Sequence, residues 1–385
     1  MIVTHLRLKN WRNFRDVDAS LGERTYLLGA NASGKSNLLD VFRFLHDVSK
    51  PQGGGLQKAI LDRGGIQKVR CLHARRDTEV RIEVHLSESR YGSTPDWRYI
   101  LGFKPEGKGA QRTLISCEQV WRKGESLLDR PDQADKDDPI RLTQTAIEQI
   151  QANAQFRDVA DFFGGIAYLH LVPQLLKYGD QIGGKYLEDD PFGQGLLERI
   201  SKTPKKTRDS RLKRIEKALA LAVPQFKELR FTQDRVTGRP HLEAMYSHYR
   251  PNAGWQSEEQ FSDGTLRLLG LLWALIDGDS LLLLEEPELS LNDAIVKEIP
   301  GLLDRVQREA KRRYRQVLIS THSEALLSNP GIDGRGVLLL EPNAEGTKVR
   351  AINADETVAL RSGLSIAEVV LPKARPKGIE QLSLW

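Results

Sequence analysis

The sequence is poor in cysteine and methionine, with two residues of each among 385. Cys71 and Cys117 are too few for a disulfide framework, and neither has neighbours at the spacing of metal ligands. The cysteines therefore support neither a disulfide-rich secreted fold nor a cysteine-based metal site. Such usage suits a reducing compartment, so we expect a cytoplasmic protein.

Long apolar runs and a strong charge bias are also absent. Charged residues interrupt the most apolar stretch, 266–284, and leave only 268–276 free of charge, which is too short to span a bilayer. The first residues enter charged alternation directly, without the apolar core of a signal peptide. We therefore expect no membrane association. The formal net charge is +5, which permits a nucleic-acid partner without requiring one.

Apolar periodicity predicts helices alternating with strands. Helices are expected over 35–48, 142–163, 211–222, 264–277 and 293–313, and strands at 26–28, 80–86, 97–101, 166–171, 281–284, 317–320 and 337–341. Strands separated by helices of this length favour a parallel sheet covered on both faces. The strands at 80–86 and 97–101 predict an antiparallel layer, and the acidic run 129–138 predicts an exposed loop.

A glycine loop, GANASGKSN, occupies residues 29–37 between an apolar strand and an amphipathic helix. It satisfies the P-loop pattern G-x-x-x-x-G-K-[ST], in which backbone N–H groups and a helix N-terminus face phosphate oxygens. Lys35 would reach the β- and γ-phosphates of ATP, and Ser36 would bind Mg²⁺. The predicted ATP-binding residues of this loop are Gly29, Asn31, Gly34, Lys35, Ser36 and Asn37.

Two acidic residues follow the apolar strand 281–284. A buried strand that ends in two carboxylates is typical of a Walker B motif, whose first acid holds Mg²⁺ and whose second polarises the attacking water. Aspartate is the usual first acid, and here it is Glu285. The longer side chain still reaches the metal, directly or through water. We predict Glu285 as a metal ligand with Ser36, and Glu286 as the general base.

A further strand, in QVLISTHS (316–323), leads to His322. Parallel strands of one sheet end at the same edge, where open α/β sheets bind their ligands. We therefore expect His322 to meet the γ-phosphate, as a catalytic residue together with Lys35 and Glu286.

The order of these motifs resembles the ABC-type ATPases, specifically the RecF, SMC and OLD-like branch. The segments that carry the resemblance are LRLKNWRNF (6–14), GANASGKSN (29–37), FSDGTLRLLGLL (261–272), LLLLEEPELSLND (281–293) and ISTHS (319–323). The resemblance implies a P-loop NTPase fold with an ABC-ATPase head, a mostly parallel core sheet, an antiparallel β layer and a helical insertion. It also implies hydrolysis of ATP by a head-to-head homodimer with two ATP molecules at the interface.

The segment 261–272 occupies the signature position of that family. The resemblance implies that Ser262 and Gly264 contact the γ-phosphate bound by the opposite protomer. The sequence departs from L-S-G-G-Q, because Phe261, Asp263 and Thr265 replace leucine, glycine and glutamine. Ser262 still begins a helix whose N-terminus can face phosphate.

The resemblance divides the chain into four parts. Residues 1–120 are expected to form a nucleotide-binding lobe with the β layer, and 121–230 a mainly helical insertion. Residues 231–350 carry the signature, the Walker B acids and the switch histidine, and 351–385 a C-terminal helix and tail. The Q-loop glutamine is not placed: Gln67 is one candidate, and a surface loop is the alternative interpretation.

Basic clusters occur at 202–217 and 308–315, and either could be a solvated helix face or a surface for a phosphate backbone. OLD-like relatives often carry a nuclease domain after the ATPase, but residues 352–385 are too short for one. We therefore expect any cutting activity to come from another polypeptide. The closing segment 372–385 is consistent with a tail that docks on a partner.

Several functions remain open at this point. The leading one is an ATP-driven switch that acts on DNA or controls a separate effector, such as a nuclease or toxin, in anti-phage defence by analogy. A RecF/SMC-like DNA repair or recombination ATPase is the second. A transporter ATPase subunit is disfavoured because the motifs resemble the non-transporter branch. A head that binds ATP without turnover is a further alternative, supported by Glu285 in place of aspartate.

Overall fold

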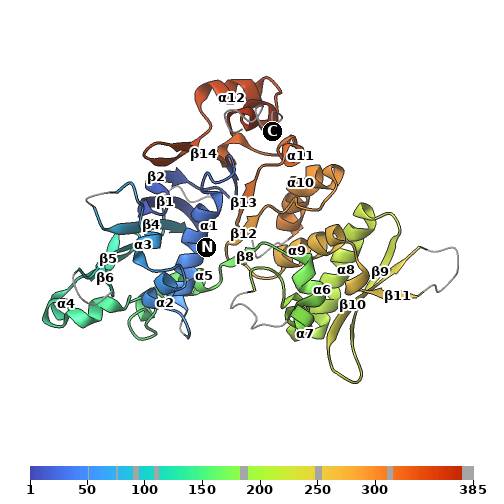
Figure 1. Ribbon diagram of the computed structural model, residues 1–385, viewed down its shortest axis with the longest axis horizontal. Helices are drawn as coiled ribbons and strands as arrows, with labels where there is room; N and C mark the ends of the chain where they lie inside the picture. The colour runs from blue at the N-terminus through green and yellow to red at the C-terminus, as the bar shows by residue number, and fades with distance from the viewer. Residues whose placement is uncertain are drawn as a thin grey trace. The chain divides into compact units, whose positions relative to one another are not determined.

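The computed structural model describes residues 1–50, 52–74, 77–89, 95–107, 112–182, 190–247, 254–309 and 315–374. The chain forms two compact units (Figure 1). Unit 1 comprises Met1–Ile166, Asp279–Leu283 and Arg315–Trp385, and unit 2 comprises Ala167–Gly278 and Leu284–Tyr314. The four-part division made from the sequence stays a prediction. The predicted docking tail, from residue 375 onward, and residues 310–314 of the second basic cluster lie outside the described residues.

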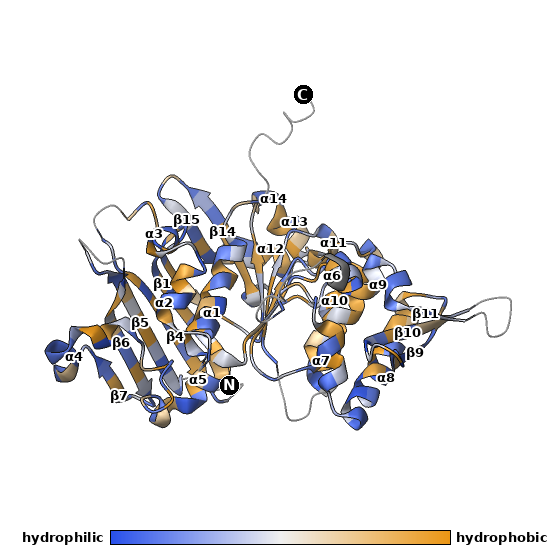
Figure 2. Cartoon of the chain, turned by 60° about the horizontal axis from the view of Figure 1, so that its bottom comes forward, coloured by the Kyte–Doolittle hydropathy of each residue, from blue (hydrophilic) through white to orange (hydrophobic). Residues whose placement is uncertain are grey.

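Unit 1 contains an antiparallel sheet of six strands in the order β2-β1-β4-β5-β6-β7. Its strands are β1 (Ile2–Trp11), β2 (Phe14–Ser20), β4 (Val80–Ser87), β5 (Trp97–Pro105), β6 (Thr113–Arg122) and β7 (Glu125–Arg130). In β1, Leu6 and Leu8 are buried while Arg7 and Lys9 face solvent, the alternation of a sheet with one covered face (Figure 2). The predicted antiparallel layer is confirmed.

A second six-stranded sheet has the order β15-β14-β3-β13-β12-β8. Its strands are β3 (Arg24–Leu28), β8 (Ala167–Leu169), β12 (Leu282–Glu285), β13 (Val317–Thr321), β14 (Val337–Asn343) and β15 (Gly346–Ala351). Strand β3 pairs in parallel with β13 and β14, and β15 pairs antiparallel with β14. All five residues of β13 are buried, as expected for a parallel strand covered on both faces. The predicted parallel core is therefore confirmed.

Unit 1 also contains helices and 3₁₀ turns. The longest, α1, begins directly after the glycine loop and buries Leu38, Phe42 and Leu45, three apolar positions at helical spacing. The helices and 3₁₀ turns of unit 1 are α1 (Lys35–Ser49), α2 (Leu56–Leu61), α3 (Ile66–Val69), α4 (Gln133–Asp137), η1 (Pro139–Thr143), η2 (Ala154–Phe156), α5 (Arg157–Gly164), α11 (Glu324–Leu327), η4 (Gly334–Gly336), α12 (Ala354–Arg361), α13 (Ile366–Val369) and α14 (Leu371–Ala374).

Unit 2 combines helices with a small antiparallel sheet of order β11-β10-β9. Its elements are α6 (Pro173–Ile182), α7 (Leu196–Lys202), α8 (Lys205–Ala222), β9 (Phe226–Gln233), β10 (Pro240–Tyr246), β11 (Trp255–Ser257), η3 (Glu258–Gln260), α9 (Asp263–Ile276) and α10 (Asp293–Glu309). Helix α8 packs against β9 and α9 through Leu212, Ile215 and Leu219. In the part of the chain described here, no helix is long and apolar enough to cross a bilayer.

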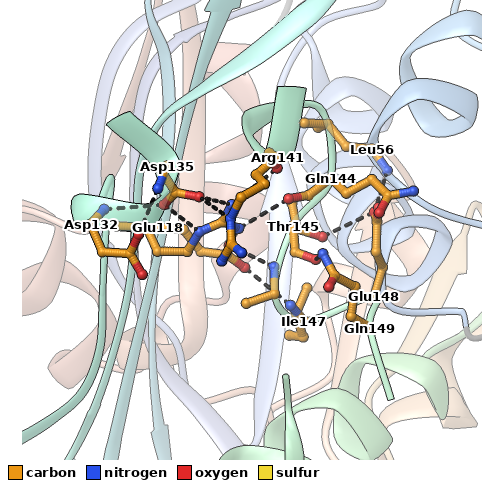
Figure 3. A network of polar contacts seen from close by, with 12 residues as sticks. Leu56, Glu118, Asp132, Asp135, Arg141, Gln144, Thr145, Ile147, Glu148 and Gln149 are labelled. Atoms are coloured by element: carbon orange, nitrogen blue, oxygen red, sulfur yellow. Dashed lines mark hydrogen bonds and ion pairs between the residues drawn. The ribbon is translucent and has the colours of Figure 1, made fainter. Parts of the chain in front are cut away.

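The helix predicted over 142–163 is wrong. Only its last third is α-helical, in α5, and the rest consists of turns. The backbone N–H groups of Ala146 and Ile147 donate to the Glu118 carboxylate at 2.7 and 3.1 Å, instead of entering a helical ladder. Figure 3 shows this cluster. A buried carboxylate from a distant strand therefore overrides the local periodicity.

The exposed loop predicted at 129–138 is wrong for Arg130 and Asp135, whose side chains are buried. Arg130 donates to Glu118 at 3.0 Å and to both oxygens of Asp135 at 2.8 and 2.9 Å. These contacts hold the pKa of Asp135 well below its ordinary value. The charges of the run are buried because they pair with each other and with the sheet.

Candidate functional site

The glycine loop wraps closely, and two of its glycines are required by their surroundings. Gly34 has φ 101°, in the left-handed region, and directly precedes α1. A Cβ atom on Gly34 would lie 2.2 Å from Asn13 Nδ2, and one on Gly29 would lie 2.4 Å from Ser33 Oγ. Only glycine fits at such positions without displacing its neighbours. The loop therefore brings its backbone to the N-terminus of a fifteen-residue helix.

Lys35 lies at the centre of this loop. Its ammonium group donates to the carbonyls of Gly29 at 2.8 Å and Ala30 at 3.2 Å, and its side chain is buried. The Ser33 hydroxyl is fully buried and has no hydrogen-bond partner among the described residues. The loop therefore combines a central ammonium group, glycines that leave its backbone open, and a buried hydroxyl. This combination fits the chemistry of a bound phosphate group.

Asn13 supports the loop, and the sequence analysis missed it. Its Nδ2 donates to the Ser33 carbonyl at 3.0 Å and to Thr347 Oγ1 at 2.8 Å. Its Oδ1 accepts from Asn37 Nδ2 at 2.8 Å. The amide of Asn37, predicted to bind nucleotide, is therefore engaged in holding the loop. The available signal was the motif 6–14, which contains Asn13, in the turn between β1 and β2.

His322 leaves the core sheet at the same edge as the glycine loop. Strands β3 and β13 pair in parallel, with Leu28 opposite Thr321, and both residues end their strands. Gly29 and His322 therefore begin adjacent loops of unit 1, and the His322 side chain is exposed. The predicted common edge is confirmed, whereas contact of His322 with a γ-phosphate stays a prediction.

The acidic pair lies at the end of β12, where Glu285 is the last residue of the strand and Glu286 follows it, and both residues belong to unit 2. The hydroxyl of Tyr168 donates to the Glu285 carboxylate, and His170 Nδ1 lies 3.2 Å from the Glu285 carbonyl oxygen. Both contacts come from β8 and the residue after it, and the sequence carried no signal for them. Glu286 has φ 45°, a left-handed conformation that is rare outside glycine. Such backbone strain concentrates at functional positions.

The signature segment begins α9 in the same unit. Ser262 caps the helix, because its Oγ accepts the Thr265 N–H at 3.1 Å. A Cβ on Gly264 would lie 2.8 Å from the Ser290 carbonyl oxygen, so the loop after the acidic pair packs directly against the signature. Asp263 accepts hydrogen bonds from Gln174 at 2.8 Å and Lys177 at 2.9 Å, two residues of α6.

One further residue of unit 2 lies within the signature segment and near the acidic pair. Arg267 lies one turn into α9. Burial lowers the pKa of its guanidinium group, and the negative charges of Asp263 and Glu286 oppose this shift. The sequence analysis did not single out Arg267. Gln67, the candidate Q-loop glutamine, is exposed on α3 of unit 1. Gln174, by contrast, donates to Asp263 of the signature segment.

The predicted residues therefore fall into two sets. The glycine loop and His322 belong to unit 1, whereas Glu285, Glu286, Ser262 and Gly264 belong to unit 2. Their assembly into one ATP site stays a prediction. The described residues contain no group of three or more His, Cys, Asp or Glu side chains able to hold a metal. Hydroxyl and carboxylate oxygens such as those of Ser36 and Glu285 suit Mg²⁺, which keeps waters and phosphate oxygens as its other ligands.

Comparison with known families decides the class of protein. The sequence profile of the family described as "AAA domain, putative AbiEii toxin, Type IV TA system" matches residues 24–328. This range includes the glycine loop, the signature segment, the acidic pair and His322. The chain belongs to this AAA-domain family. Members of this family carry an ATPase domain, and the resemblance to the ABC-type ATPases of the RecF/SMC branch is confirmed.

Curated relatives of this AAA-domain chain include DNA replication and repair proteins RecF. That of Agathobacter rectalis is 31% identical over 91 residues, which cover 23% of this chain and 25% of the relative. That of Roseiflexus castenholzii is 32% identical over 108 residues, covering 25% and 27%. The chain thus matches only about a quarter of the length of these relatives.

Solved structures extend the likeness to the fold of nearly the whole chain. The Smc head bound to the C-winged helix domain of ScpA has a TM-score of 0.58 at 15% identity, covering 93% of this chain and 100% of that one. A Smc head domain with an extended coiled coil, bound to the C-terminal domain of ScpA from Pyrococcus furiosus, has a TM-score of 0.51 at 12% identity, covering 94% and 98%. The ABC-head fold predicted from the motifs is confirmed.

Proposed function

We propose that the chain is an ATP-hydrolysing switch that forms a head-to-head homodimer when ATP is bound. The observation that carries this proposal is the glycine loop, in which buried Lys35 sits within a cradle at the N-terminus of α1. A triphosphate would replace the two loop carbonyls as the partner of the Lys35 ammonium group. The exchange is favourable because charge-assisted hydrogen bonds to phosphate are stronger than those to carbonyls.

In this proposal each remaining residue has one role. Ser36 and Glu285 hold Mg²⁺, which neutralises charge on the β- and γ-phosphates. Glu286 accepts the proton of the attacking water, and His322 donates a hydrogen bond to the γ-phosphate. The Tyr168 hydroxyl keeps the longer Glu285 side chain in one orientation.

The signature segment would serve the site of the second copy. Ser262 and the first N–H groups of α9 present the positive end of a fourteen-residue helix, which suits the γ-phosphate of an ATP bound by the other protomer. ATP then joins the two heads, and hydrolysis by Glu286 releases them. This two-state cycle is the output of the switch.

For the biological role we propose control of a separate effector, such as a nuclease or toxin, in anti-phage defence. Support comes from the family description, which names the AbiEii toxin and a type IV toxin–antitoxin system. Copurification of a small toxin or nuclease with the tagged protein supports this role. The absence of any stoichiometric partner in such a preparation contradicts it.

A second candidate, action on DNA, is favoured by the outer face of α8. Lys206, Lys213 and Lys217 are exposed and form no ion pair among the described residues, and their spacing places them on one side of the helix. The RecF relatives are described as DNA replication and repair proteins. If three such lysines contact phosphates, a plot of the logarithm of DNA affinity against the logarithm of salt concentration should have a slope of about −2.7. In a salt titration, Lys213→Glu with Lys217→Glu should weaken DNA binding and flatten this slope.

Lys35→Ala tests the cradle. The variant loses the charge-assisted hydrogen bonds to phosphate, each worth about 1.5–3 kcal/mol, so ATP affinity should fall by about 10–100-fold or more. Lys58→Ala, which removes a partly exposed lysine of α2 in the same unit, is the matched control and should bind ATP normally. Retention of full affinity by Lys35→Ala in a titration refutes the assignment.

Glu286→Gln tests the dimer. Loss of the general base should stop turnover and trap ATP between two heads, so sedimentation should show a dimer with ATP and Mg²⁺ and a monomer without them. A sample that remains monomeric under both conditions contradicts the head-to-head arrangement.

A further inference from the structure

Asp263 places a negative charge at the start of α9, at the position where the family signature has glycine. The proposed function brings the γ-phosphate of a second copy to this helix N-terminus. A carboxylate there stabilises the isolated helix, but it repels an incoming phosphate. The departure from the signature therefore requires compensation if the segment is to serve a nucleotide.

The compensation comes from α6. Lys177 Nζ lies 2.9 Å from Asp263 Oδ1, and Gln174 Nε2 donates to Asp263 Oδ2 at 2.8 Å, so both carboxylate oxygens are engaged. The Lys177 side chain is 13% exposed and that of Asp263 is 37% exposed. Solvent therefore screens this pair less than an open surface pair.

The Lys177 ammonium group also retains donor capacity. It carries three N–H donors, and Asp263 is its single hydrogen-bond partner among the described residues. A lysine in this state can neutralise the carboxylate and donate to a phosphate oxygen at the same time. A glycine at position 263 would need no such partner.

We propose that Lys177 is a charge-compensating residue of the second copy's ATP site, holding Asp263 aside and offering its remaining donors to the γ-phosphate. The proposal rests on the ATP-dependent homodimer described above. It adds α6, which no signature motif includes, to the surface that recognises the nucleoside triphosphate across the interface.

The experiment uses the full chain with Glu286→Gln as parent, at fixed salt with ATP and Mg²⁺. Lys177→Met keeps the aliphatic stem and removes the charge. Sedimentation velocity should show a dimer dissociation constant at least about tenfold higher than that of the parent. Adding Asp263→Asn should recover part of this loss, since the uncompensated charge is then gone while the Lys177 donor stays absent. Lys227→Met, which removes an exposed lysine of β9 in the same unit, is the matched control and should dimerise like the parent.

Two further readouts separate compensation from a structural ion pair. ATP affinity of the monomer, measured with a fluorescent analogue at low protein concentration, should be unchanged in Lys177→Met because its own glycine loop is intact. Asp263→Asn alone should dimerise at least as tightly as the parent. If Asp263→Asn weakens the dimer as much as Lys177→Met, the pair merely joins α6 to α9, and the proposal is overturned. Parent-like dimerisation of Lys177→Met also overturns it. If the Glu286→Gln parent stays monomeric with ATP and Mg²⁺, the result contradicts the proposed ATP-dependent homodimer itself.

Discussion

Arg130→Met should destabilise unit 1 strongly. The guanidinium makes five hydrogen bonds of 2.8–3.0 Å, three of them to Glu118 and Asp135, whose side chains are fully buried. Methionine fills similar space but leaves buried Glu118 without its cation and leaves buried Asp135 with the half-exposed Arg141, at 3.2 Å, in place of two cations. Breaking a buried pair from one side costs about 3–5 kcal/mol. For a unit of this size the midpoint of thermal unfolding should fall by about 6–20 °C.

The pH dependence of this loss follows from its cause. Burial already raises the Glu118 pKa against the opposing effect of Arg130, and without Arg130 it should rise further, whereas the lowered Asp135 pKa should rise back toward its ordinary value. Because the raised folded pKa of Glu118 costs stability as pH rises above its unfolded pKa, the Glu118 share of the deficit should be small near pH 4 and full at pH 7. The Asp135 share should persist at pH 4, because the lowered Asp135 pKa of the parent still stabilises the fold there.

The assay is thermal unfolding of the parent and variant at both pH values. The triple variant with Glu118→Gln and Asp135→Asn, which removes the charges together, should recover most of the midpoint. A shift below about 2 °C in Arg130→Met, or a triple variant no more stable than the single one, would refute the reasoning.

Two other perturbations test the glycine loop and the C-terminal part. Gly34→Ala combines a left-handed backbone with a Cβ 2.2 Å from Asn13 Nδ2, whereas Gly363 has the same φ of 101° and no neighbour within 4 Å. In urea unfolding, Gly363→Ala should therefore lower the free energy of unfolding by about 1–2 kcal/mol. Gly34→Ala should lower it by more and should also weaken ATP binding. Equal losses of stability in the two variants would exclude a clash at Gly34. Glu356 accepts hydrogen bonds from Arg350 and Lys373, which lower its pKa to about 2. A carboxyl whose pKa is lower in the folded state stabilises the protein above its unfolded pKa, about 4.5, and this stabilisation is lost as pH falls toward 2. Glu356→Gln should therefore lower the free energy of unfolding by about 1–3 kcal/mol at pH 7 and by little at pH 2. Parallel stability profiles of the two proteins over that range would contradict this assignment.

Local sequence predicted the elements that are marked by a contiguous pattern of residues. The glycine loop, α1 and the ends of β3 and β13 follow from contiguous patterns of apolar, glycine and polar residues. The prediction over 142–163 was wrong because its backbone N–H groups bond to Glu118, which lies 28 and 29 residues away from Ala146 and Ile147. Periodicity within a segment does not contain such a partner.

The candidate site shows the same division. The sequence by itself predicted the glycine loop, the acidic pair and the ATPase family, because each is encoded in a short motif of neighbouring residues. Tertiary structure alone decided that Asn13 holds the loop, that Tyr168 holds Glu285, and that Lys177 neutralises Asp263. These pairs lie 20 to 117 residues apart along the chain, and only folding brings a donor and acceptor at such separations within 3 Å.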